Sequence, residues 1–426
     1  MIYIYLLYSN SELYYLIQMT LLEELKLRGF IHQCTNEEKL NNALNNGSIS
    51  FYIGFDCTAK SLHVGSLIQI MMMRIFQKYG HTPIVLIGEG TTKIGDPSGK
   101  DQSRKMLSTE DIKFNSINLI KVFDKFLVLN SKNKPIYSNN ADWLDNINYI
   151  DFLRDYGKHF TINKMLSFDS VKLRLDREQS LSFVEFNYMI LQAYDYLELH
   201  NRYKCILQIG GSDQWGNIVN GIDLIRRDSA SEVYGLTTPL LTNAKNEKMG
   251  KTVDGAVWLN EEILSPYDYW QFWRNTDDRD VFRFLKLFTD IGIDEIEVLE
   301  NDNNINNVKI VLANAATEML HGKRNAELAE KTANDIFKES GSSENLPLIN
   351  VSMGKKELFL NDLIIEIGFV SSKSETRKLV KNNGVKINRV LVSDELKILS
   401  ANDFDKNNEI LVSVGKKKHF IIKKLD

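Results

Sequence analysis

Residues 48–88 read SISFYIGFDCTAKSLHVGSLIQIMMMRIFQKYGHTPIVLIG, and this stretch decides the fold. Ser48–Asp56 alternates along its length and is rich in β-forming residues, which predicts a strand. Gly65–Tyr79 is apolar on most faces and stops at Gly80, which predicts a buried helix. Pro83–Gly88 is a continuous apolar run, typical of a buried strand. A strand, a helix and a second strand in this order predict a parallel β–α–β unit.

The same order of elements returns later in the chain. Tyr203–Ile209 predicts a strand, Ser212–Arg227 a helix after a Gly-Gly turn, and Val233–Leu241 another strand. Between the two halves, Thr109–His200 predicts a mostly helical insert. We therefore expect an α/β domain, with a Rossmann-like parallel sheet and a helical insert.

The composition of the rest of the chain predicts three further segments: a helical domain, a linker and a small C-terminal domain. Residues after Lys251 are helical in pattern and rich in aromatics (YDYWQFWRN, DVFRFLKLF), whereas Gly341–Asn350 has the composition of a linker. From about Met353 a helix and short strands follow, which predicts a small α+β domain. The expected boundaries are a disordered extension at 1–18, the α/β domain at 19–240 with its insert at about 109–200, a helical domain at 241–338, a linker at 339–352 and the small domain at 353–426.

Charge is distributed unevenly along the chain. The net charge of all 426 residues is −4, which does not indicate a general polyanion binder. Residues 355–426 contain fifteen Lys/Arg against ten Asp/Glu, a net charge of +5, so the remainder carries −9. A basic C-terminal piece on an acidic body predicts local contact with nucleic acid.

The cysteine pattern and the first eight residues indicate in which cellular compartment the protein works. Cys34, Cys57 and Cys205 are widely spaced and form no CxxC pair, which disfavours a structural zinc site and fits a reducing cytoplasm. The apolar run Met1–Tyr8 is too short to span a membrane and has no basic segment before it. We therefore expect no bound metal, no membrane association and a cytoplasmic protein.

Two short segments, about 185 residues apart, are candidates for binding phosphate groups. His63-Val64-Gly65-Ser66 precedes the predicted helix, whose N-terminus offers free N–H groups and a positive dipole end to a phosphate. His63 and Thr58 can donate hydrogen bonds there, although a lone histidine before a helix is more often a cap or a core residue. The second segment, KNEKMGKT at residues 245–252, ends like a phosphate-binding P-loop, but residue 245 is not the glycine that motif requires. It is either a cationic phosphate loop or a solvated basic turn.

Longer stretches around these segments resemble one family. Residues 52–59 (YIGFDCTA), 95–100 (GDPSGK) with Arg104, 188–195 (YMILQAYD) and 208–217 (QIGGSDQWGN) are similar to stretches of the bacterial tyrosyl-tRNA synthetases. The two short segments resemble the HIGH and KMSKS signatures of class I aminoacyl-tRNA synthetases. The resemblance runs from about Met19 to the C-terminus. Cys57 replaces the family's proline, and Ser66 replaces its second signature histidine.

The resemblance implies an activity and a set of partners. L-Tyrosine and ATP, with Mg²⁺, would give tyrosyl-adenylate and pyrophosphate, and the tyrosyl group would pass to the terminal adenosine of tRNA(Tyr). No tightly bound cofactor is expected. The family is homodimeric with the helical insert near the interface, and one tRNA touches both subunits.

The resemblance also implies roles for individual residues. The catalytic set would be His63, Thr58, Lys100, Arg104, Lys248 and Lys251. The tyrosine-binding set would be Tyr52, Asp96, Tyr188, Gln192, Asp195 and Gln214, with Tyr52 and Asp195 on the phenolic hydroxyl and Asp96, Tyr188 and Gln192 on the ammonium group. The ATP-binding set would be Gly54, Asp56, Gly65, Ser66, Gly210, Gly211, Asp213, Met249, Lys251 and Thr252. Helical spacing of i, i+4 and i+7 independently places Tyr188, Gln192 and Asp195 on one face.

The C-terminal piece has two interpretations. Ser371–Gly384 followed by VKINRV resembles the small RNA-binding domain named for ribosomal protein S-four. Arg377, Lys378, Lys381 and Lys386 would then contact RNA phosphates. The alternative is an ordinary amphipathic helix with a basic face.

Three alternatives to a tyrosyl-tRNA synthetase share part of this sequence pattern, and each is disfavoured by particular residues. The sister tryptophanyl enzyme is disfavoured by Asp195 with Tyr52 and by the basic C-terminal piece. A small-molecule nucleotidyltransferase would not explain residues 248–252 or an RNA domain. A non-catalytic RNA-binding paralogue is disfavoured by the presence of His63, Lys248 and Lys251.

Overall fold

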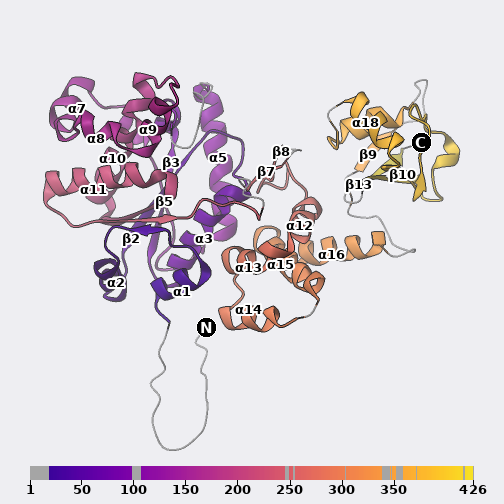
Figure 1. Cartoon of the computed structure of the whole chain (residues 1–426), viewed down its shortest axis with the longest axis horizontal. Coiled ribbons are helices and arrows are strands. Elements are labelled where there is room, and N and C mark those ends of the chain that lie inside the picture. The colour runs from indigo at the N-terminus through magenta and orange to yellow at the C-terminus, as the bar shows by residue number, and fades with distance from the viewer. Residues whose placement is uncertain are drawn as a thin grey trace, which may run out of the picture. The chain divides into compact units, whose positions relative to one another are not determined.

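The computed structural model describes residues 19–97, 107–244, 249–252, 255–302, 304–337, 346, 348–351, 358–370, 372–415 and 418–425. The chain divides into two compact units, whose helices and strands are labelled in Figure 1. One comprises the chain up to Lys60 together with Leu67–Leu241, and the other comprises Ser61–Ser66 together with Thr242 onward. The first signature segment is therefore part of the second unit. In the parts of the chain that the structure describes, no helix is long and apolar enough to cross a membrane.

The first unit is built on a six-stranded sheet with the order β1-β6-β5-β2-β3-β4. Its strands are β1 (Gln33–Cys34), β2 (Ser50–Asp56), β3 (Thr82–Gly88), β4 (Ile136–Asn139), β5 (Cys205–Gly211) and β6 (Tyr234–Thr238). All neighbours pair in parallel except β1, which runs antiparallel to β6. Every residue of β6 and nearly every residue of β3 is buried, because helices cover a parallel sheet on both faces. The α/β fold class predicted from the sequence is confirmed.

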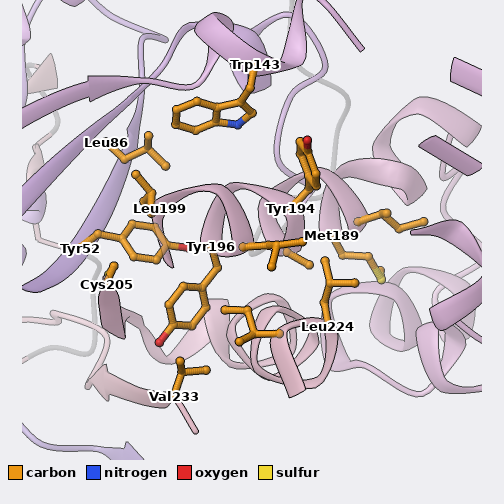
Figure 2. Close-up of a cluster of buried hydrophobic side chains, with 14 of the residues drawn as sticks. Tyr52, Leu86, Trp143, Met189, Tyr194, Tyr196, Leu199, Cys205, Leu224 and Val233 are labelled. Atoms are coloured by element: carbon orange, nitrogen blue, oxygen red, sulfur yellow. The ribbon is translucent and has the colours of Figure 1, made fainter. Parts of the chain in front are cut away.

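Helices connect these strands and flank the sheet. The helices of this unit are α1 (Leu21–Arg28), α2 (Glu37–Asn45), α3 (Val64–Lys78, whose first residues lie in the second unit), α4 (Glu89–Thr92), α5 (Thr109–Phe126), α6 (Ala141–Leu144), α7 (Tyr149–Asp155), α8 (Ile162–Leu166), α9 (Asp169–Asp176), α10 (Phe183–Tyr203) and α11 (Trp215–Ser229). Figure 2 shows the core that α10 shares with the sheet, with Tyr52 of β2 and Leu86 of β3 near Tyr196 and Leu199 of α10. Site residues on β2 and α10 are thus fixed by one apolar core.

Some elements of this unit differ from the sequence prediction. β4 lies inside the predicted helical insert, yet it pairs with β3 from Ile84↔Ile136 to Ile87↔Asn139. Tyr203 ends α10 instead of starting a strand, because Lys204 takes a left-handed conformation (φ 53°) and caps the helix. The Val233–Leu241 strand is shorter, at Tyr234–Thr238, and its partner β1 was not predicted.

The second unit contains a helical part, as the aromatic-rich stretch predicted. Its helices are α12 (Pro266–Arg274), α13 (Val281–Phe288), α14 (Ile293–Glu300), α15 (Ile305–His321) and α16 (Lys323–Phe337). Ser265 caps α12 and Pro266 occupies its first turn, where no N–H donor is lost. Trp273 packs its ring against Phe284 and Phe288, which joins α12 to α13.

The C-terminal part is a small α+β fold. Its elements are β9 (Leu348–Val351), α17 (Leu360–Glu366), α18 (Lys373–Lys381), β10 (Val385–Ile387), β11 (Val390–Leu391), β12 (Glu409–Val414) and β13 (Lys418–Lys424), with the sheet order β11-β10-β12-β13-β9. β9 falls in the stretch assigned to the linker, but it alternates exposed and buried residues and pairs in parallel with β13. The fold of this part therefore begins before residue 353.

Candidate active site

The carboxyl ends of the parallel strands gather the polar residues of the first unit. β2 ends at Asp56 beside Gly88 of β3, and Ile87 of β3 pairs with Asn139 at the end of β4. Loops that leave this edge are where open α/β sheets bind their ligands. Asp56, Asp96 and residues 210–214 follow or end strands of this sheet, Tyr52 and Gly54 lie within β2, and Tyr188, Gln192 and Asp195 lie on α10.

Asp195 of α10 is the most deeply buried carboxylate of the predicted set, with 2% of its surface exposed. Trp143 Nε1 donates to Asp195 Oδ1 at 2.7 Å, and Asn140 Nδ2 donates to Oδ2 at 3.0 Å. Burial raises the pKa of Asp195 to about 7, although the two donors oppose that rise. A carboxylate can accept more than two hydrogen bonds, so Asp195 retains capacity for a ligand donor.

Tyr52 of β2 presents a buried hydroxyl to the same region. Its ring is 1% exposed and packs against the Tyr196 ring, with 5.2 Å between centroids (Figure 2). Among the described residues its O–H has no hydrogen-bond partner. Burial first, and then the charge of Asp195, raise the pKa of Tyr52 well above its ordinary value, so the phenol stays protonated. Leaving such a donor unpaired costs about 1–3 kcal/mol, which a ligand acceptor would recover.

A polar network joins three of the remaining tyrosine-site residues. Gln214 Nε2 donates to Asp96 Oδ2 at 2.9 Å. Asn217 Nδ2 donates to Gln192 Oε1 at 2.9 Å and to Gln214 Oε1 at 3.1 Å. Asp96 follows α4, Gln192 lies on α10 and Asn217 lies on α11, so the network ties three elements together. It holds Asp96 and Gln192, two of the three side chains predicted for the ammonium group, in one cluster.

Tyr188 takes a different partner from these residues. Its hydroxyl donates to Asp56 Oδ2 at 3.2 Å, and Thr91 Oγ1 donates to Asp56 Oδ1 at 2.8 Å. Tyr188 was predicted to contact the ammonium group, whereas Asp56 was predicted to contact ATP. The structure therefore connects these two predicted sets through one carboxylate.

The two signature segments lie side by side within the second unit. Val64 N–H donates to Val257 O at 2.9 Å, and Leu259 N–H donates to Leu62 O at 2.9 Å. His63 stands opposite Trp258 in the resulting antiparallel bridge. The short strands β7 (Lys251–Thr252) and β8 (Gly255–Ala256) form the hairpin that leads into this contact.

Two glycines permit this close contact. A Cβ atom on Gly65 would lie 2.6 Å from His63 Cε1 and 2.9 Å from Met249 O, both too close for any side chain. Gly250 has φ +88°, and its Cβ atom would lie 2.5 Å from His63 Nδ1. Gly65 N–H donates to His63 Nδ1 at 2.9 Å, so the neutral ring carries its proton on Nε2 and can donate from there. The histidine is thereby oriented by its own segment.

The remaining residues of the predicted ATP set lie on several elements: Gly54 lies inside β2, Ser66 in the first turn of α3, and Asp213 just after β5. Thr58, of the predicted catalytic set, follows β2. Gly54, Thr58 and Asp213 are exposed, and Ser66 is half-buried, with its N–H donating to His63 O at 2.8 Å. Gly210 and Gly211 end β5, and a Cβ atom on Gly211 would lie 2.5 Å from Asp213 Oδ1. A Cβ atom on Gly210 would lie 3.0 Å from Gln214 Cβ, so this glycine lets Gln214 lie close to the end of β5.

Some predictions fall outside the described residues. These are Lys100, Arg104 and Lys248, together with the side chains of Lys251 and Thr252. Met249 is described and is buried, with its carbonyl oxygen close to Gly65. In the C-terminal part, Arg377, Lys378 and Lys381 of α18 and Lys386 of β10 are all exposed, although Lys381 also pairs with Glu395 at 3.4 Å.

The structure adds four residues that the sequence prediction missed: Thr91, Asn140, Trp143 and Asn217. Asn217 lies inside the stretch that matched the family, so the signal for it was present. Thr91, Asn140 and Trp143 lie outside the quoted stretches, and only their contacts with Asp56 and Asp195 reveal them.

Comparisons with known proteins agree over most of the chain. A family model described as tRNA synthetases class I (W and Y) matches residues 43–338, and a tyrosine–tRNA ligase SYY-like C-terminal domain matches residues 339–422. The tyrosine–tRNA ligase of Pelagibacter ubique is 60% identical over 401 residues, covering 93% of this chain and 98% of the relative. That of Zymomonas mobilis is 53% identical over 401 residues, covering 93% of this chain and 97% of the relative.

Solved structures of tyrosyl-tRNA synthetases are also similar to this protein, over about three quarters of the chain. A C-terminally truncated mitochondrial tyrosyl-tRNA synthetase of Aspergillus nidulans has a TM-score of 0.67 at 28% identity, covering 75% of this chain and 95% of that chain. A tyrosyl-tRNA synthetase of Archaeoglobus fulgidus, solved with L-tyrosine, has a TM-score of 0.55 at 16% identity, and it shares the fold. The chain therefore belongs to the class I tRNA synthetases (W and Y), as a tyrosine–tRNA ligase.

Proposed function

We propose that this ligase recognises its amino acid by the phenolic hydroxyl, through Tyr52 and Asp195. The observation that carries the proposal is the pair itself: a buried O–H with no partner among the described residues, near a buried carboxylate that two donors already orient. The substrate hydroxyl would accept from Tyr52 and donate to Asp195. Phenylalanine would leave the Tyr52 O–H unpaired and would deprive Asp195 of its third donor. Tyrosyl-tRNA synthetases are themselves the standard example of this kind of rejection.

The ammonium group of tyrosine would bind among Asp96, Gln192 and Gln214. Asp96 supplies a negative charge, and Gln192 and Gln214 are already oriented toward one another by Asn217. Tyr188 would approach the same group, with its hydroxyl on Asp56. In this arrangement one end of the substrate is bound by charge and the other by hydrogen bonds to its hydroxyl.

Activation of the bound tyrosine would depend on stabilising charge on ATP. The attacking carboxylate is already ionised at neutral pH, so the protein has no proton to remove. His63 Nε2–H, Thr58 and the N-terminus of α3 would donate to phosphate oxygens, with Asp56, Ser66, Asp213 and the Gly210-Gly211 turn around the nucleotide. Lys100, Arg104, Lys248 and Lys251 would neutralise the departing pyrophosphate.

ATP would bring Mg²⁺ with it as a counter-ion of its phosphates, which is the usual way proteins meet this ion. Within the described residues, no group of three or more His, Cys, Asp or Glu side chains could hold a metal ion. We therefore assign no residue to Mg²⁺. The ion would spread the negative charge of the leaving group, and the residues named above would position ATP.

A direct assay tests this function. The purified protein is given ATP, labelled pyrophosphate and one amino acid at a time, and pyrophosphate exchange into ATP is measured. We expect exchange with L-tyrosine and very little with L-phenylalanine or L-tryptophan. Exchange driven by tryptophan, or none with any amino acid, would overturn the proposed function.

We also propose that two copies of the chain associate through the helical insert. Between residues 149 and 184 the described chain exposes a set of large apolar side chains: Tyr149, Ile150, Leu153, Ile162, Leu166, Leu175, Phe183 and Val184. Ile150 and Phe183 are each 69% exposed. A protein–protein interface is one common reason for a segment to expose several large apolar side chains.

Sedimentation tests the association. Replacing Ile150 and Phe183 together by aspartate should shift the protein from dimer to monomer at micromolar concentration. Replacing the exposed Val298 of α14 by aspartate is the matched control, because it is 70% exposed but lies outside the insert. A double variant that stays dimeric would place the interface elsewhere.

The C-terminal part would hold tRNA(Tyr) by its phosphates, in a cytoplasmic protein whose described cysteines are free thiols. Changing Arg377, Lys378, Lys381 and Lys386 together to alanine should lower aminoacylation about tenfold and leave pyrophosphate exchange unchanged. The salt dependence of tRNA binding should also become shallower, by about one in logarithmic slope per lost contact. The exposed Lys406, changed to alanine, is the control. Unchanged tRNA affinity in the quadruple variant would contradict the assignment.

A further inference from the structure

Three neighbouring strand ends meet at one buried threonine. Asp56 ends β2, Gly88 ends β3 and Asn140 follows β4 directly. Thr91 lies on the single turn α4 that leaves β3, and it is 3% exposed. Its Oγ1 atom is 2.8 Å from Asp56 Oδ1 and 2.9 Å from Asn140 Nδ2. Thr91 therefore contacts residues from both neighbouring strands.

The hydrogen bonds at this junction have a fixed direction. Gly90 N–H donates to Asn140 Oδ1 at 2.8 Å, which sets the orientation of the Asn140 amide. The two N–H bonds of Nδ2 then point to Asp195 Oδ2 and to Thr91 Oγ1. Thr91 accepts one bond from Asn140. Its single hydrogen has two acceptors in reach, and the Asp56 carboxylate at 2.8 Å is closer and more strongly accepting than Gly88 O at 3.3 Å. A continuous chain thus runs from Asp195 through Asn140 and Thr91 to Asp56.

The junction is closely packed and leads directly to Asp96. A Cβ atom on Gly88 would lie 2.5 Å from Asp56 Oδ1 and 2.6 Å from Thr91 Oγ1. The Thr91 carbonyl oxygen accepts from Ile94 N–H at 3.0 Å and from Gly95 N–H at 2.9 Å. The backbone of Thr91 therefore closes the turn that precedes Asp96, while its hydroxyl belongs to the chain. A substitution that keeps the backbone can test the hydroxyl by itself.

We propose that Thr91 is a positioning residue that couples the tyrosine site to the ATP site. Its hydroxyl orients Asp56 directly, and it orients Asp195 through Asn140. The inference rests on the proposed function, in which Asp195 contacts the tyrosine hydroxyl and Asp56 contacts ATP. Without the hydroxyl, one N–H of Asn140 loses its acceptor and Asp56 loses a donor, so both substrates bind less well.

Two substitutions separate the hydroxyl from the shape of the residue. Thr91→Val keeps the shape and removes the hydroxyl, whereas Thr91→Ser keeps the hydroxyl. In pyrophosphate exchange we expect Thr91→Val to raise the KM of tyrosine and the KM of ATP by about tenfold each, and Thr91→Ser to stay within about twofold of wild type. Equal behaviour of the two variants would overturn the proposal.

Thr92 provides the matched control for loss of a buried hydroxyl on α4. It donates to Gly88 O at 2.5 Å and accepts from Cys57 N–H at 2.8 Å, but it takes no part in the chain. Thr92→Val should lower the melting temperature and leave the two KM values within about twofold. If it raises both KM values as Thr91→Val does, loosening of α4 explains the result and the proposal fails.

A double variant tests the route to each substrate. In an Asn140→Ala background, Thr91→Val should no longer raise the KM of tyrosine, because the link to Asp195 is already lost. It should still raise the KM of ATP through Asp56. Equal effects in both backgrounds would contradict a chain through Asn140. Thr91→Ala replaces Thr91→Val if the valine variant does not fold, and tyrosine-driven exchange by wild type checks the proposed function separately.

Discussion

The tyrosine pocket and the contact between the signature segments are built in opposite ways. In the proposed pocket Asp195 and Tyr52 are buried side chains. Hydrogen bonds from Asn140 and Trp143 orient Asp195, and the Tyr196 ring packs against Tyr52. In the signature contact, backbone groups meet across Gly65 and Gly250, and His63 is only half-buried. The difference follows from the ligands. The pocket must distinguish tyrosine from phenylalanine, which lacks the hydroxyl, and this requires hydrogen-bonding side chains that are buried away from water. Phosphates, in contrast, are bound by backbone N–H groups and cations.

The largest expected effect comes from filling the space at the signature contact. Gly65→Ala places a Cβ atom within 2.9 Å of Met249 O, so the start of α3 or residues 249–250 must shift. A shift of about 1 Å at a site that orients phosphates can cost about a hundredfold in rate. We expect tyrosine-driven pyrophosphate exchange to fall by at least that factor, while equilibrium binding of tyrosine alone is unchanged.

Gly292 offers the control for this substitution. It lies in the second unit with φ −64°, and nothing is within 4 Å of its Cβ position. Gly292→Ala should leave exchange unchanged. If Gly65→Ala weakens tyrosine binding as much as it slows exchange, the two regions are not separable and the comparison fails.

A smaller effect, confined to the tyrosine pocket, should appear on changing the pH. Burial raises the pKa of Asp195 to about 7, and the substrate hydroxyl would donate to its ionised form. Protonation as the pH falls through 7 removes that acceptor, so the dissociation constant of tyrosine should rise by up to about tenfold between pH 8 and pH 6. Asp195→Asn, which does not titrate, should give a flat profile. If the dissociation constant of tyrosine for the wild-type protein did not change with pH, Asp195 would not be the acceptor for the substrate hydroxyl.

The sequence predicted those parts of the fold that depend on local patterns. The alternation of residues 48–56, the apolar run 83–88 and the long helix between them are visible without tertiary contacts, and β2, α3 and β3 confirm them. β4 was missed because four residues between polar neighbours carry little periodic signal, and its strand identity comes from pairing with β3.

The site divides in the same way. Asp195, Tyr52 and Gln214 lie in stretches that matched a family, so they could be named in advance. Thr91, Asn140 and Trp143 have the polar or mixed surroundings of ordinary turn residues. The pairing of β3 with β2 brings Thr91 to Asp56, and the pairing of β4 with β3 brings Asn140 and Trp143 into the same region, where they contact Asp195. Residues whose role depends on contacts distant in sequence could not be predicted from one sequence.

The central claim is that Tyr52 and Asp195 together bind the phenolic hydroxyl and so select tyrosine over phenylalanine. The ratio of kcat/KM for tyrosine to kcat/KM for phenylalanine tests this claim most directly. The ratio is measured by pyrophosphate exchange in wild type, Tyr52→Phe and Asp195→Ala, with Glu198→Ala, one turn along α10, as control. We predict a large ratio in wild type and in the control. Tyr52→Phe should lower it at least about tenfold, and Asp195→Ala about a hundredfold or more. An unchanged ratio in both pocket variants would contradict the account.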